Sequence, residues 1–521
     1  MTDRDDDHDP SDPTRLARRR FVQGAAALLP ALVVGCAGKG GDPLAGDDDG
    51  TDDGEGTGTG TGTTAEPTTG GTGPDTGADA TTGEPAFVPA DVPEDVDLFP
   101  RTVIAGEMKP TSVMFAVLAA DKAEVTLRLW SHAKGAPVGA AGVEVVHEQA
   151  CGPDADGFIK VKVEGLEPGA WYGYGFFRAD EAGGFVARSL LGKVRTAIAD
   201  DASEPVTLGW ASCIGAGFAI PNYVDPANVT PMKWKSIDRM AEQELDVFIH
   251  LGDQLYLDEV FDAGGSYAMY VAAWAAGHGG GYRALYPNQG AYFTWDDHEV
   301  TDNGAIDPFA PTPEDVEKTD NAIRAYYTCH PIEASVRADR LWRAFRWGKT
   351  VEFIVLDGRY DAKTAGENYL SPAQEQFLLD TLKASPCVFK CIVNSAPFAN
   401  LPASTPENDD RWSQFSQRAR IKQFIDDNAI TGIVSITGDI HMSYVGRLEL
   451  APVTASDAIP ECCVTSGNVW PVITDFDAAQ FPYIDARPTV PTITFDPAAA
   501  AIHVRYLYED GSLAHESTIA V

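Results

Sequence analysis

The chain contains 521 residues, more than one ordinary hydrophobic core accommodates, so we expect at least two folded domains. Asp and Glu number 77 against 39 Lys and Arg, and the formal net charge is -38. Proteins bind nucleic acids through clusters of Lys and Arg, so this composition argues against a nucleic-acid-binding surface. An acidic protein can still bind phosphate groups if metal ions supply the positive charge.

The N-terminal residues have the features of an export signal. Arg18-Arg19-Arg20-Phe21-Val22 precedes an apolar run from Gly24 to Val34, a pattern that resembles a twin-arginine signal. The residues Val33-Val34-Gly35-Cys36 resemble a lipobox. We therefore predict that residues 1–36 are a signal peptide, that the mature protein is periplasmic or on the cell surface, and that lipid on Cys36 is its membrane anchor. An ordinary cleaved signal or a weak membrane helix is the alternative, although the apolar run is short for a span.

Residues 37–95 have low complexity. They consist mainly of Asp, Gly, Thr and Pro, in runs such as Gly56-Thr57-Gly58-Thr59-Gly60. A segment of this composition cannot bury a core, so we predict a disordered acidic linker.

Residues 96–200 contain short segments in which apolar and polar residues alternate, such as Glu124–Trp130 and Gly157–Val163. Gly and Pro separate these segments, which indicates antiparallel strands and a small all-β sandwich of the immunoglobulin type. The segment Gly165–Tyr174 resembles the penultimate strand of fibronectin type III modules. We expect its aromatic residues to belong to the core of the sandwich.

Residues 201–521 alternate strands with helices, which is typical of an α/β fold. Helices are predicted for Lys233–Glu244 and for Ser371–Lys383, where Ser371 has the position of an N-cap. A hairpin is predicted around Asp510-Gly511. The predicted apolar strands are Val206–Cys213, Val247–Leu251, Val351–Leu356, Phe389–Val393 and Gly432–Ile436.

Possible metal ligands occur in four loops that follow strand-like runs. They are Ser212 with Cys213, Asp253 with Tyr256, Asp296-Asp297-His298, and Asp439 with His441. The carboxyl ends of strands in an open α/β sheet meet at one crevice, so we expect these loops to converge. Clustered carboxylates need a cation, and a site with two metals is a recurring arrangement for phosphate-ester hydrolysis. His250 lies inside an apolar strand, where we expect a core histidine rather than a ligand.

Five motifs carry a family resemblance. They are Ala211-Ser212-Cys213, Gly252-Asp253-Gln254-Leu255-Tyr256, Trp295-Asp296-Asp297-His298-Glu299 with Asn303, Leu356-Asp357-Gly358-Arg359 and Gly438-Asp439-Ile440-His441. With these motifs the sequence resembles the alkaline phosphatase D family of the calcineurin-like metallophosphoesterases, over the whole folded part of the chain. The resemblance implies a four-layer α/β sandwich over residues 201–521, preceded by the small β-sandwich. Most metallophosphoesterases begin with Asp-x-His, and Cys213 stands in its place here.

The resemblance also implies metals and their ligands. A ferric ion (Fe3+) would be held by Cys213, Asp253, Tyr256 and His441, with Asp253 bridging to a second metal. Calcium ions (Ca2+) would occupy the neighbouring positions, and the candidate ligands of the second metal are Asp297, Asn303 and Asp439. Which of Asp296, Asp297 and Asn303 binds metal stays open. Mn2+ or Zn2+ are the alternative metals.

Two further residues are candidates for catalysis. Cations lower the pKa of a bound water, so that hydroxide can attack phosphorus at neutral pH. His298 would then protonate the leaving oxygen, oriented by Glu299 or Asp302, or it is a structural histidine. Arg359 would bind a phosphate oxygen, or it pairs with Asp357 beneath the site.

These features predict an exported, metal-dependent hydrolase of phosphate esters, an alkaline phosphatase or phosphodiesterase that uses a metal-activated hydroxide. We expect a monomer that acts on a phosphate-ester substrate, and the resemblance alone favours diesters. The sequence leaves open whether a lid covers the cleft, and the Gly-, Ala- and Tyr-rich segment Ala263–Gly281 is the place to look for one. The alternative is a non-catalytic surface lipoprotein whose degenerate metallophosphoesterase scaffold binds a partner.

Overall fold

The computed structural model describes residues 87–214, 234–302, 305–333, 340–361, 363–402, 411–467 and 475–521. Residues Pro85–Val521 form one compact unit. The predicted signal peptide with Cys36 and most of the predicted linker lie outside the described residues, so both stay predictions. Among the helices that are described, none combines the length and the apolar character needed to cross a membrane.

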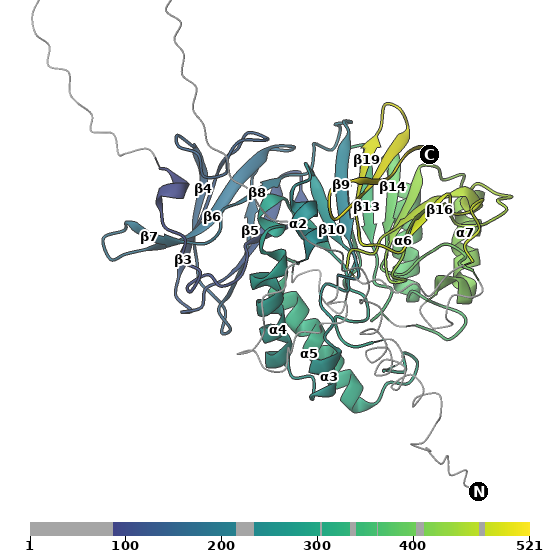
Figure 1. Ribbon diagram of the computed structural model, residues 1–521, viewed down its shortest axis with the longest axis horizontal. Helices are drawn as coiled ribbons and strands as arrows, with labels where there is room; N and C mark the ends of the chain where they lie inside the picture. The colour runs from purple at the N-terminus through teal and green to yellow at the C-terminus, as the bar shows by residue number, and fades with distance from the viewer. Residues whose placement is uncertain are drawn as a thin grey trace, which may run out of the picture. The chain divides into compact units, whose positions relative to one another are not determined.

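Three β-sheets make up most of this unit (Figure 1). In spatial order, the nine-stranded sheet consists of β21 (Leu513–Ala520), β20 (Ala501–Tyr508), β19 (Thr489–Asp496), β9 (Val206–Ala211), β10 (Val247–His250), β11 (Ala291–Phe293), β1 (Ile104–Lys109), β2 (Ser112–Leu118) and β5 (Phe158–Glu164). The seven-stranded sheet consists of β12 (Arg343–Trp347), β13 (Val351–Val355), β14 (Phe389–Val393), β15 (Ile433–Thr437), β17 (Pro460–Cys463), β16 (Ser443–Arg447) and β18 (Tyr483–Asp485). The five-stranded sheet contains β4 (Val145–Cys151), β3 (Val125–Ser131), β6 (Trp171–Ala179), β7 (Phe185–Arg188) and β8 (Gly192–Arg195).

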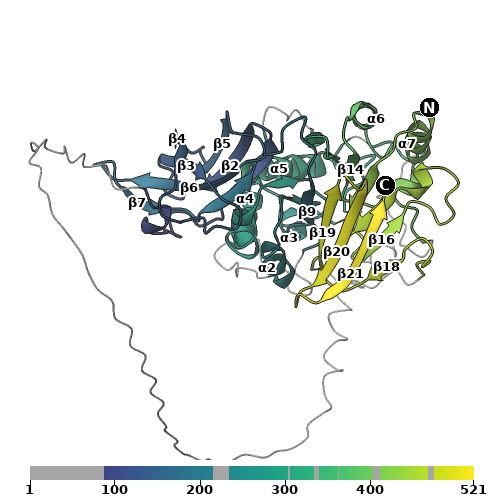
Figure 2. The same cartoon turned by 90° about the horizontal axis from the view of Figure 1, so that it is seen from above.

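Parallel pairing brings the carboxyl ends of the central strands to the same edge of each large sheet. In the nine-stranded sheet, β9, β10 and β11 are parallel neighbours. In the seven-stranded sheet, β13, β14, β15 and β17 are parallel neighbours. The C-terminal strands β19, β20 and β21 are antiparallel and lie side by side, shown in yellow in Figure 2. The hairpin predicted around Asp510-Gly511 is confirmed by the pairing of β20 with β21.

The two large sheets pack face to face around a common core. Strand β10 shows why, because its side chains alternate between the two faces of the sheet. Val247 and Ile249 join a core cluster that also contains Val351 and Phe353 of β13. Phe248 instead belongs to a second cluster, on the helix side of the nine-stranded sheet. The apolar runs of the sequence therefore become strands that are buried on both faces.

Helices cover the outer faces of both sheets. The helices α2 (Lys235–Ala241), α3 (Asp258–Asp262), α4 (Tyr267–Gly279) and α5 (Pro313–Cys329) contribute to the cluster on the nine-stranded sheet. The helices α6 (Pro372–Ala384) and α7 (Ser416–Asp427) contribute to the cluster on the seven-stranded sheet. Short 3-10 helices occupy Pro89–Asp91, Gly281–Arg283, Tyr286–Asn288, Trp412–Gln414 and Ser456–Ala458. The layers run helix, sheet, sheet, helix, which confirms the predicted four-layer α/β sandwich.

Both predicted helices are present. The helix predicted for Ser371–Lys383 is α6, and the Ser371 side chain accepts a hydrogen bond from the backbone N–H of Gln374, so the predicted N-cap is confirmed. The helix predicted for Lys233–Glu244 is the shorter α2.

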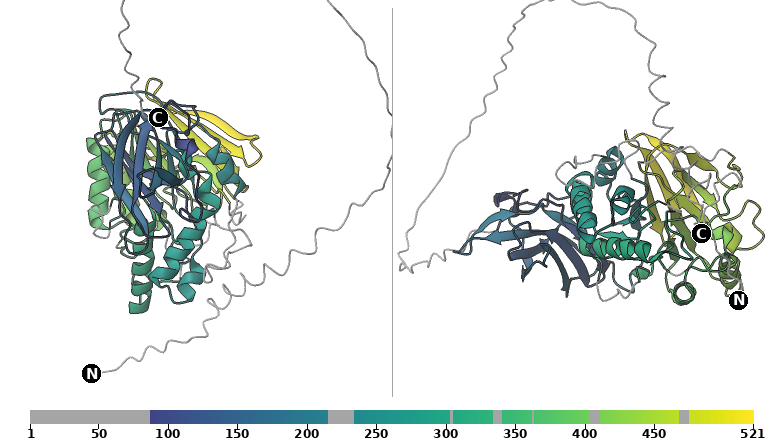
Figure 3. Two further views of the ribbon diagram at one scale, coloured as in Figure 1. Left: turned by 90° about the vertical axis from the view of Figure 1, so that its left-hand side faces the viewer. Right: turned by 90° about the horizontal axis from the view of Figure 1, so that it is seen from below.

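The segment Ala263–Gly281, the place to look for a lid, is part of the packed fold. Most of this segment forms α4, in which Tyr270 and Trp274 are completely buried. The views in Figures 2 and 3 place α4 and α5 between the N-terminal strands and the C-terminal strands. A helix packed in this way is part of the fold rather than a mobile cover.

The strands of residues 96–200 are joined to the sheet that carries β9 to β11. Strand β1 pairs with β11 in parallel at Gly106 and Ala291, and β2 and β5 extend the sheet from β1. A β-strand region is present where the small sandwich was predicted. Its fibronectin type III character and its boundary at residue 200 stay predictions.

A buried ion pair reinforces this junction. Arg343 Nε donates to Glu107 Oε1 at 2.9 Å, and Arg343 Nη2 donates to the carbonyl oxygen of Phe293 at 3.1 Å. The two charged side chains are only 6% and 5% exposed. Glu107→Ala leaves the guanidinium buried without its counter-ion, so we expect the free energy of unfolding to fall by about 3–5 kcal/mol.

Denaturant unfolding of the full chain tests this expectation. The control is Glu164→Ala. Glu164 pairs with Lys162, and the Glu164 side chain is 71% exposed. Exposed pairs contribute about 0–1 kcal/mol, so the control should unfold near the wild-type midpoint. Equal midpoints for the two variants would show that the Glu107–Arg343 pair does not stabilise the junction.

Candidate metal centre

The predicted donor residues lie in loops at the carboxyl ends of neighbouring strands. Cys213 follows β9, Asp253 follows β10, and Asp296-Asp297-His298 follows β11 in the nine-stranded sheet. Asp439 and His441 follow β15 in the seven-stranded sheet. The loops of both sheets converge, as the strand-end pattern predicts.

The backbone of these loops is unusual at four of the candidate ligands. Their φ angles are 53° at Cys213, 53° at Asp253, 69° at Asp439 and 55° at His441. Such left-handed conformations are uncommon for residues with a side chain, and they occur where the surrounding structure imposes them, often at functional sites. The preceding Gly252 has a φ of 106°, and a Cβ there would lie 2.1 Å from the backbone nitrogen of Asp296. The Gly-Asp sequence is therefore required for two loops to approach each other.

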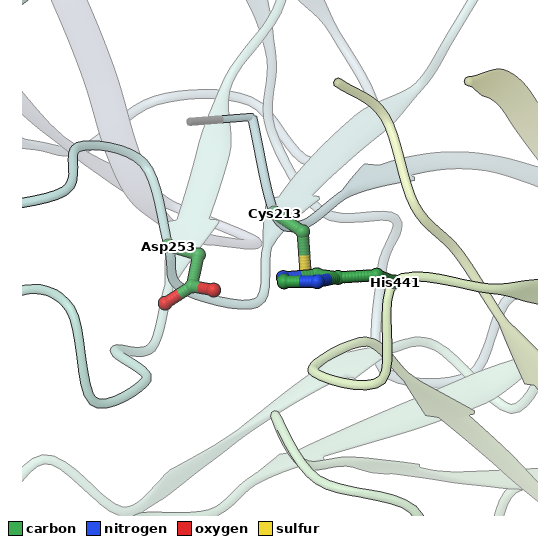
Figure 4. Close-up of side chains that lie close together, drawn as sticks. All are labelled: Cys213, Asp253 and His441. Atoms are coloured by element: carbon green, nitrogen blue, oxygen red, sulfur yellow. The ribbon is translucent and has the colours of Figure 1, made fainter. Parts of the chain in front are cut away.

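Cys213, Asp253 and His441 form the first group of possible ligands. One ligand atom from each lies within 4.8 Å of the others, and Figure 4 shows the Cys213 side chain pointing toward the His441 ring. Tyr256 belongs to the same group, since its hydroxyl donates to Asp253 Oδ2 at 3.0 Å and lies 3.0 Å from His441 Nε2. The structure thus brings together all four residues that the resemblance assigns to iron.

Two further groups adjoin the first. Asp253, Asp297 and His298 form the second, and Asp296, Asp297 and Asp439 form the third. Asp253 is shared between the first and second groups, which is the bridging position that the resemblance implies. Asn303, the remaining candidate ligand, lies outside the described residues.

The donor atoms fit a metal centre by their chemistry. Burial and the neighbouring carboxylates of Asp253 and Asp296 raise the pKa of the Cys213 thiol well above its usual value. Burial likewise raises the pKa of Asp253 well above its usual value and that of Asp297 to about 7. A bound cation reverses this effect by favouring the thiolate and the carboxylates. Among the described residues, Asp253 Oδ1 is buried without a hydrogen-bond partner, as a ligand oxygen would be.

His298 is oriented by Asp258. His298 Nδ1 lies 2.9 Å from Asp258 Oδ2, and the His298 ring stacks on the Tyr256 ring with centroids 3.9 Å apart. Burial alone would lower the pKa of His298, but the carboxylates of Asp258, Asp297 and Asp253 raise it well above its usual value. Of these carboxylates, Asp258 is not a candidate metal ligand, and its charge favours the imidazolium that a general acid requires.

The expected orienting partners of His298 were Glu299 or Asp302, and the structure corrects this. Glu299 accepts hydrogen bonds from the backbone N–H groups of Asp253, Gln254 and Asp296, at 2.9, 2.7 and 2.8 Å. It therefore holds two site loops together instead. Asp302 Oδ1 lies 3.9 Å from His298 Nε2, which is not the nitrogen that faces Asp258.

Asp258→Asn removes the negative charge beside His298 Nδ1. An opposite charge at this distance shifts a pKa by about 1–3 units, so the pKa of His298 should fall in the variant. A general acid is lost as pH rises through its pKa, so the alkaline limb of the pH profile of kcat should move to lower pH by about 1–3 units. Asp262→Asn, in the same short helix but exposed, is the control. If the alkaline limb of the pH profile moves in Asp302→Asn and not in Asp258→Asn, then Asp302 rather than Asp258 raises the pKa of His298.

Arg359 lies against the third group. Its Nε donates to Asp296 Oδ1, and its Nη2 donates to Asp439 Oδ1 at 2.7 Å. Asp357, the partner in one of the two alternatives for Arg359, accepts the backbone N–H of Arg359 at 3.0 Å.

The expectation for His250 is confirmed. His250 is completely buried, and its Nε2 lies 2.9 Å from the hydroxyl of Tyr282, so it is a core histidine. All seven cysteines that the structure describes are free and buried. Glu461 accepts from the hydroxyl of Tyr444 at 2.6 Å and from two backbone N–H groups, and supports the loop after β14.

Two solved structures share the fold of this chain. A structure of PhoD superposes with a TM-score of 0.62 and 20% identity, over 81% of this chain and 89% of that chain. Purple acid phosphatase PPD1 from yellow lupin (Lupinus luteus) superposes with a TM-score of 0.56 and 11% identity, over 81% of this chain and 75% of that chain. At these identities, the likeness establishes a shared mixed α/β fold.

The sequence comparisons define the family. A family model described as PhoD-like phosphatase matches residues 208–480, just over half of the 521 residues. The chain belongs to the PhoD-like phosphatase family. Alkaline phosphatase D of Bacillus subtilis (strain 168) is 26% identical in an alignment of length 338 that covers 56% of this chain and 54% of that protein. The chain thus spans about half the length of this curated relative.

Proposed function

We propose that this protein is a metal-dependent hydrolase of phosphate esters. The observation that carries the proposal is the shared position of Asp253, whose carboxylate belongs both to the group with Cys213 and His441 and to the group with Asp297 and His298. One carboxylate between two donor groups is the arrangement by which a protein holds two cations side by side. Membership of the PhoD-like phosphatase family supports the same reaction class.

Each group of donor residues suggests the cation that it would hold. Cys213, Asp253, Tyr256 and His441 would hold a ferric ion, because thiolate and phenolate suit it better than Ca2+. Asp253, Asp297 and Asp439, with Asn303, would hold Ca2+ or another divalent cation such as Mn2+ or Zn2+. Bound cations would acidify a water molecule and neutralise the negative charge of the phosphoryl oxygens.

His298 would deliver a proton to the leaving oxygen from Nε2. Its Nδ1 faces Asp258, and its Nε2 lies 3.7 Å from Asp297 Oδ2, on the side of the donor groups. Asp258 stabilises the imidazolium and fixes the ring, and Tyr256 supports one of its faces.

Export, anchoring and assembly are part of the proposal. The residues Arg18–Arg20 and Cys36 support export by the twin-arginine route and lipid attachment at the cell surface or in the periplasm. The excess of acidic residues supports a protein that binds its substrate but does not bind nucleic acid. We infer a monomer.

Hydrolysis of bis(p-nitrophenyl) phosphate and of p-nitrophenyl phosphate by the full chain tests the proposal. We expect turnover that a chelator abolishes and that Ca2+ or another divalent cation restores, with the diester favoured. A protein that retains its cations and cleaves neither ester would support the alternative of a non-catalytic surface lipoprotein.

A further inference from the structure

Arg359 lies where loops from both large sheets meet. Its own loop follows β13, and the loop of Asp439 follows β15, both in the seven-stranded sheet. Asp296 follows β11, in the nine-stranded sheet. Because the guanidinium contacts both carboxylates, one side chain joins three of the loops that carry the site.

The guanidinium is among the least exposed groups of the site. The side chain of Arg359 is 3% exposed, against 11% for Asp439 and 14% for His298. A buried charge is costly unless it is paired, and the fully buried carboxylate of Asp296 supplies the opposite charge. A substrate phosphate that bound through Nε, or through the Nη2 hydrogen that faces Asp439, would have to displace a carboxylate.

The loop that carries Arg359 is itself fixed. Asp357 Oδ1 accepts from Trp295 Nε1 at 2.8 Å and from the backbone N–H of Tyr360 at 2.9 Å. Gln374 accepts the backbone N–H of Asp357 at 2.7 Å and donates to its carbonyl oxygen at 3.0 Å. The Tyr360 hydroxyl donates to the carbonyl oxygen of Asp297 at 2.7 Å. These contacts hold the guanidinium in one place relative to the loop after β11.

We propose that Arg359 is a positioning residue that orients the carboxylates of the third group for a divalent cation and does not contact the substrate. This inference rests on the proposed function. The guanidinium is a planar fork with N–H groups in fixed directions, so it can hold two carboxylates at a set separation. A carboxylate has two oxygens, and a contact with Arg359 through Oδ1 is compatible with a cation on the same group.

Arg359→Lys tests the inference, because it keeps the positive charge and removes the fork. Ca2+ and Mn2+ are each titrated by calorimetry into the full chain after chelator treatment. Outer partners of metal ligands typically contribute about 10–100-fold in affinity, so we expect cation affinity to fall by that factor. The KM for bis(p-nitrophenyl) phosphate at saturating cation should be unchanged, and excess cation should restore turnover.

Asp296→Asn provides the second variant, in case the lysine variant folds poorly. It releases the guanidinium from its buried partner, and because Asp296 is itself in the third group, its loss of cation affinity should equal or exceed that of Arg359→Lys. The double variant should lose little more than either single one, because both act through the same contact. Arg195→Lys is the matched control, since Arg195 is 13% exposed and also pairs with two carboxylates, those of Asp246 and Glu204.

The outcomes separate the inference from the proposed function. If Arg359→Lys leaves cation affinity unchanged and raises KM, Arg359 contacts the substrate and the inference is wrong. If the wild-type protein binds neither cation and cleaves no ester, the proposed function fails and the inference fails with it. If the wild type binds cations and all variants bind them equally, only the inference fails.

Discussion

Cys213→Ser should remove iron from the protein and nearly abolish hydrolysis. The Cys213 sulfur lies among the Asp253 and His441 ligand atoms and is completely buried, so a lost thiolate has no replacement from solvent. A serine hydroxyl ionises far less readily than a thiol, so it would not supply the anionic ligand that the thiolate provides. We expect turnover to fall by more than the roughly 10–100-fold typical of outer partners of metal ligands. Metal analysis and the rate of diester cleavage measure the two effects.

The matched control is Cys151→Ser, because Cys151 is also buried but belongs to β4 in the five-stranded sheet. It should keep its iron and its rate. A Cys213→Ser protein with a full iron content and wild-type turnover would show that the first group is not the iron site.

His298→Gln should lower kcat while leaving the metal content intact. General acid catalysis contributes about 10²–10⁴-fold, and the leaving oxygen gains most when it is a strongly basic alkoxide. We therefore expect a loss of that size for a methyl phosphodiester and a much smaller loss for a p-nitrophenyl diester, whose leaving group needs no proton. Steady-state rates on both esters, with metal analysis of the same samples, measure the difference.

His503→Gln serves as the control, since that histidine is exposed on β20. A His298→Gln protein that has lost metal would make His298 a ligand, as its place in the second group allows. Equal losses for the two esters would show that His298 acts on something other than the leaving oxygen.

The strands and the donor loops could be predicted because their signals are local. The predicted apolar run Val247–Leu251 ends directly in Gly252-Asp253, and it became strand β10 with its donor at the carboxyl end. Ser371 and Pro372 likewise mark the start of α6 within a few residues. Such patterns need no knowledge of distant contacts.

The partner of His298 could not be predicted in this way. Asp258 lies 40 positions before His298, at the first turn of α3, where an acidic residue is ordinary because it favours the helix N-terminus. Glu299 and Asp302 are near in sequence, but the Glu299 carboxylate is committed to three backbone N–H groups. Only the fold brings Asp258 to the ring.

Small residues made the segment Ala263–Gly281 the place to look for a lid. In α4, Gly277 packs so closely on the rest of the fold that a Cβ there would lie 2.7 Å from the Leu255 side chain. The glycine therefore serves close helix packing rather than motion. The pairing of β1 with β11 is also non-local, and no turn signal between the two strands announces it.

The most direct test of the metal centre is the visible absorption spectrum of the purified, unchelated protein, recorded beside its metal content. Tyr256 and Cys213 lie together with Asp253 and His441, so ferric iron bound there should give a coloured band from its phenolate and thiolate ligands. We predict a band that accompanies iron and is lost or strongly shifted in Tyr256→Phe. A colourless protein that cleaves phosphate esters without iron would contradict the account.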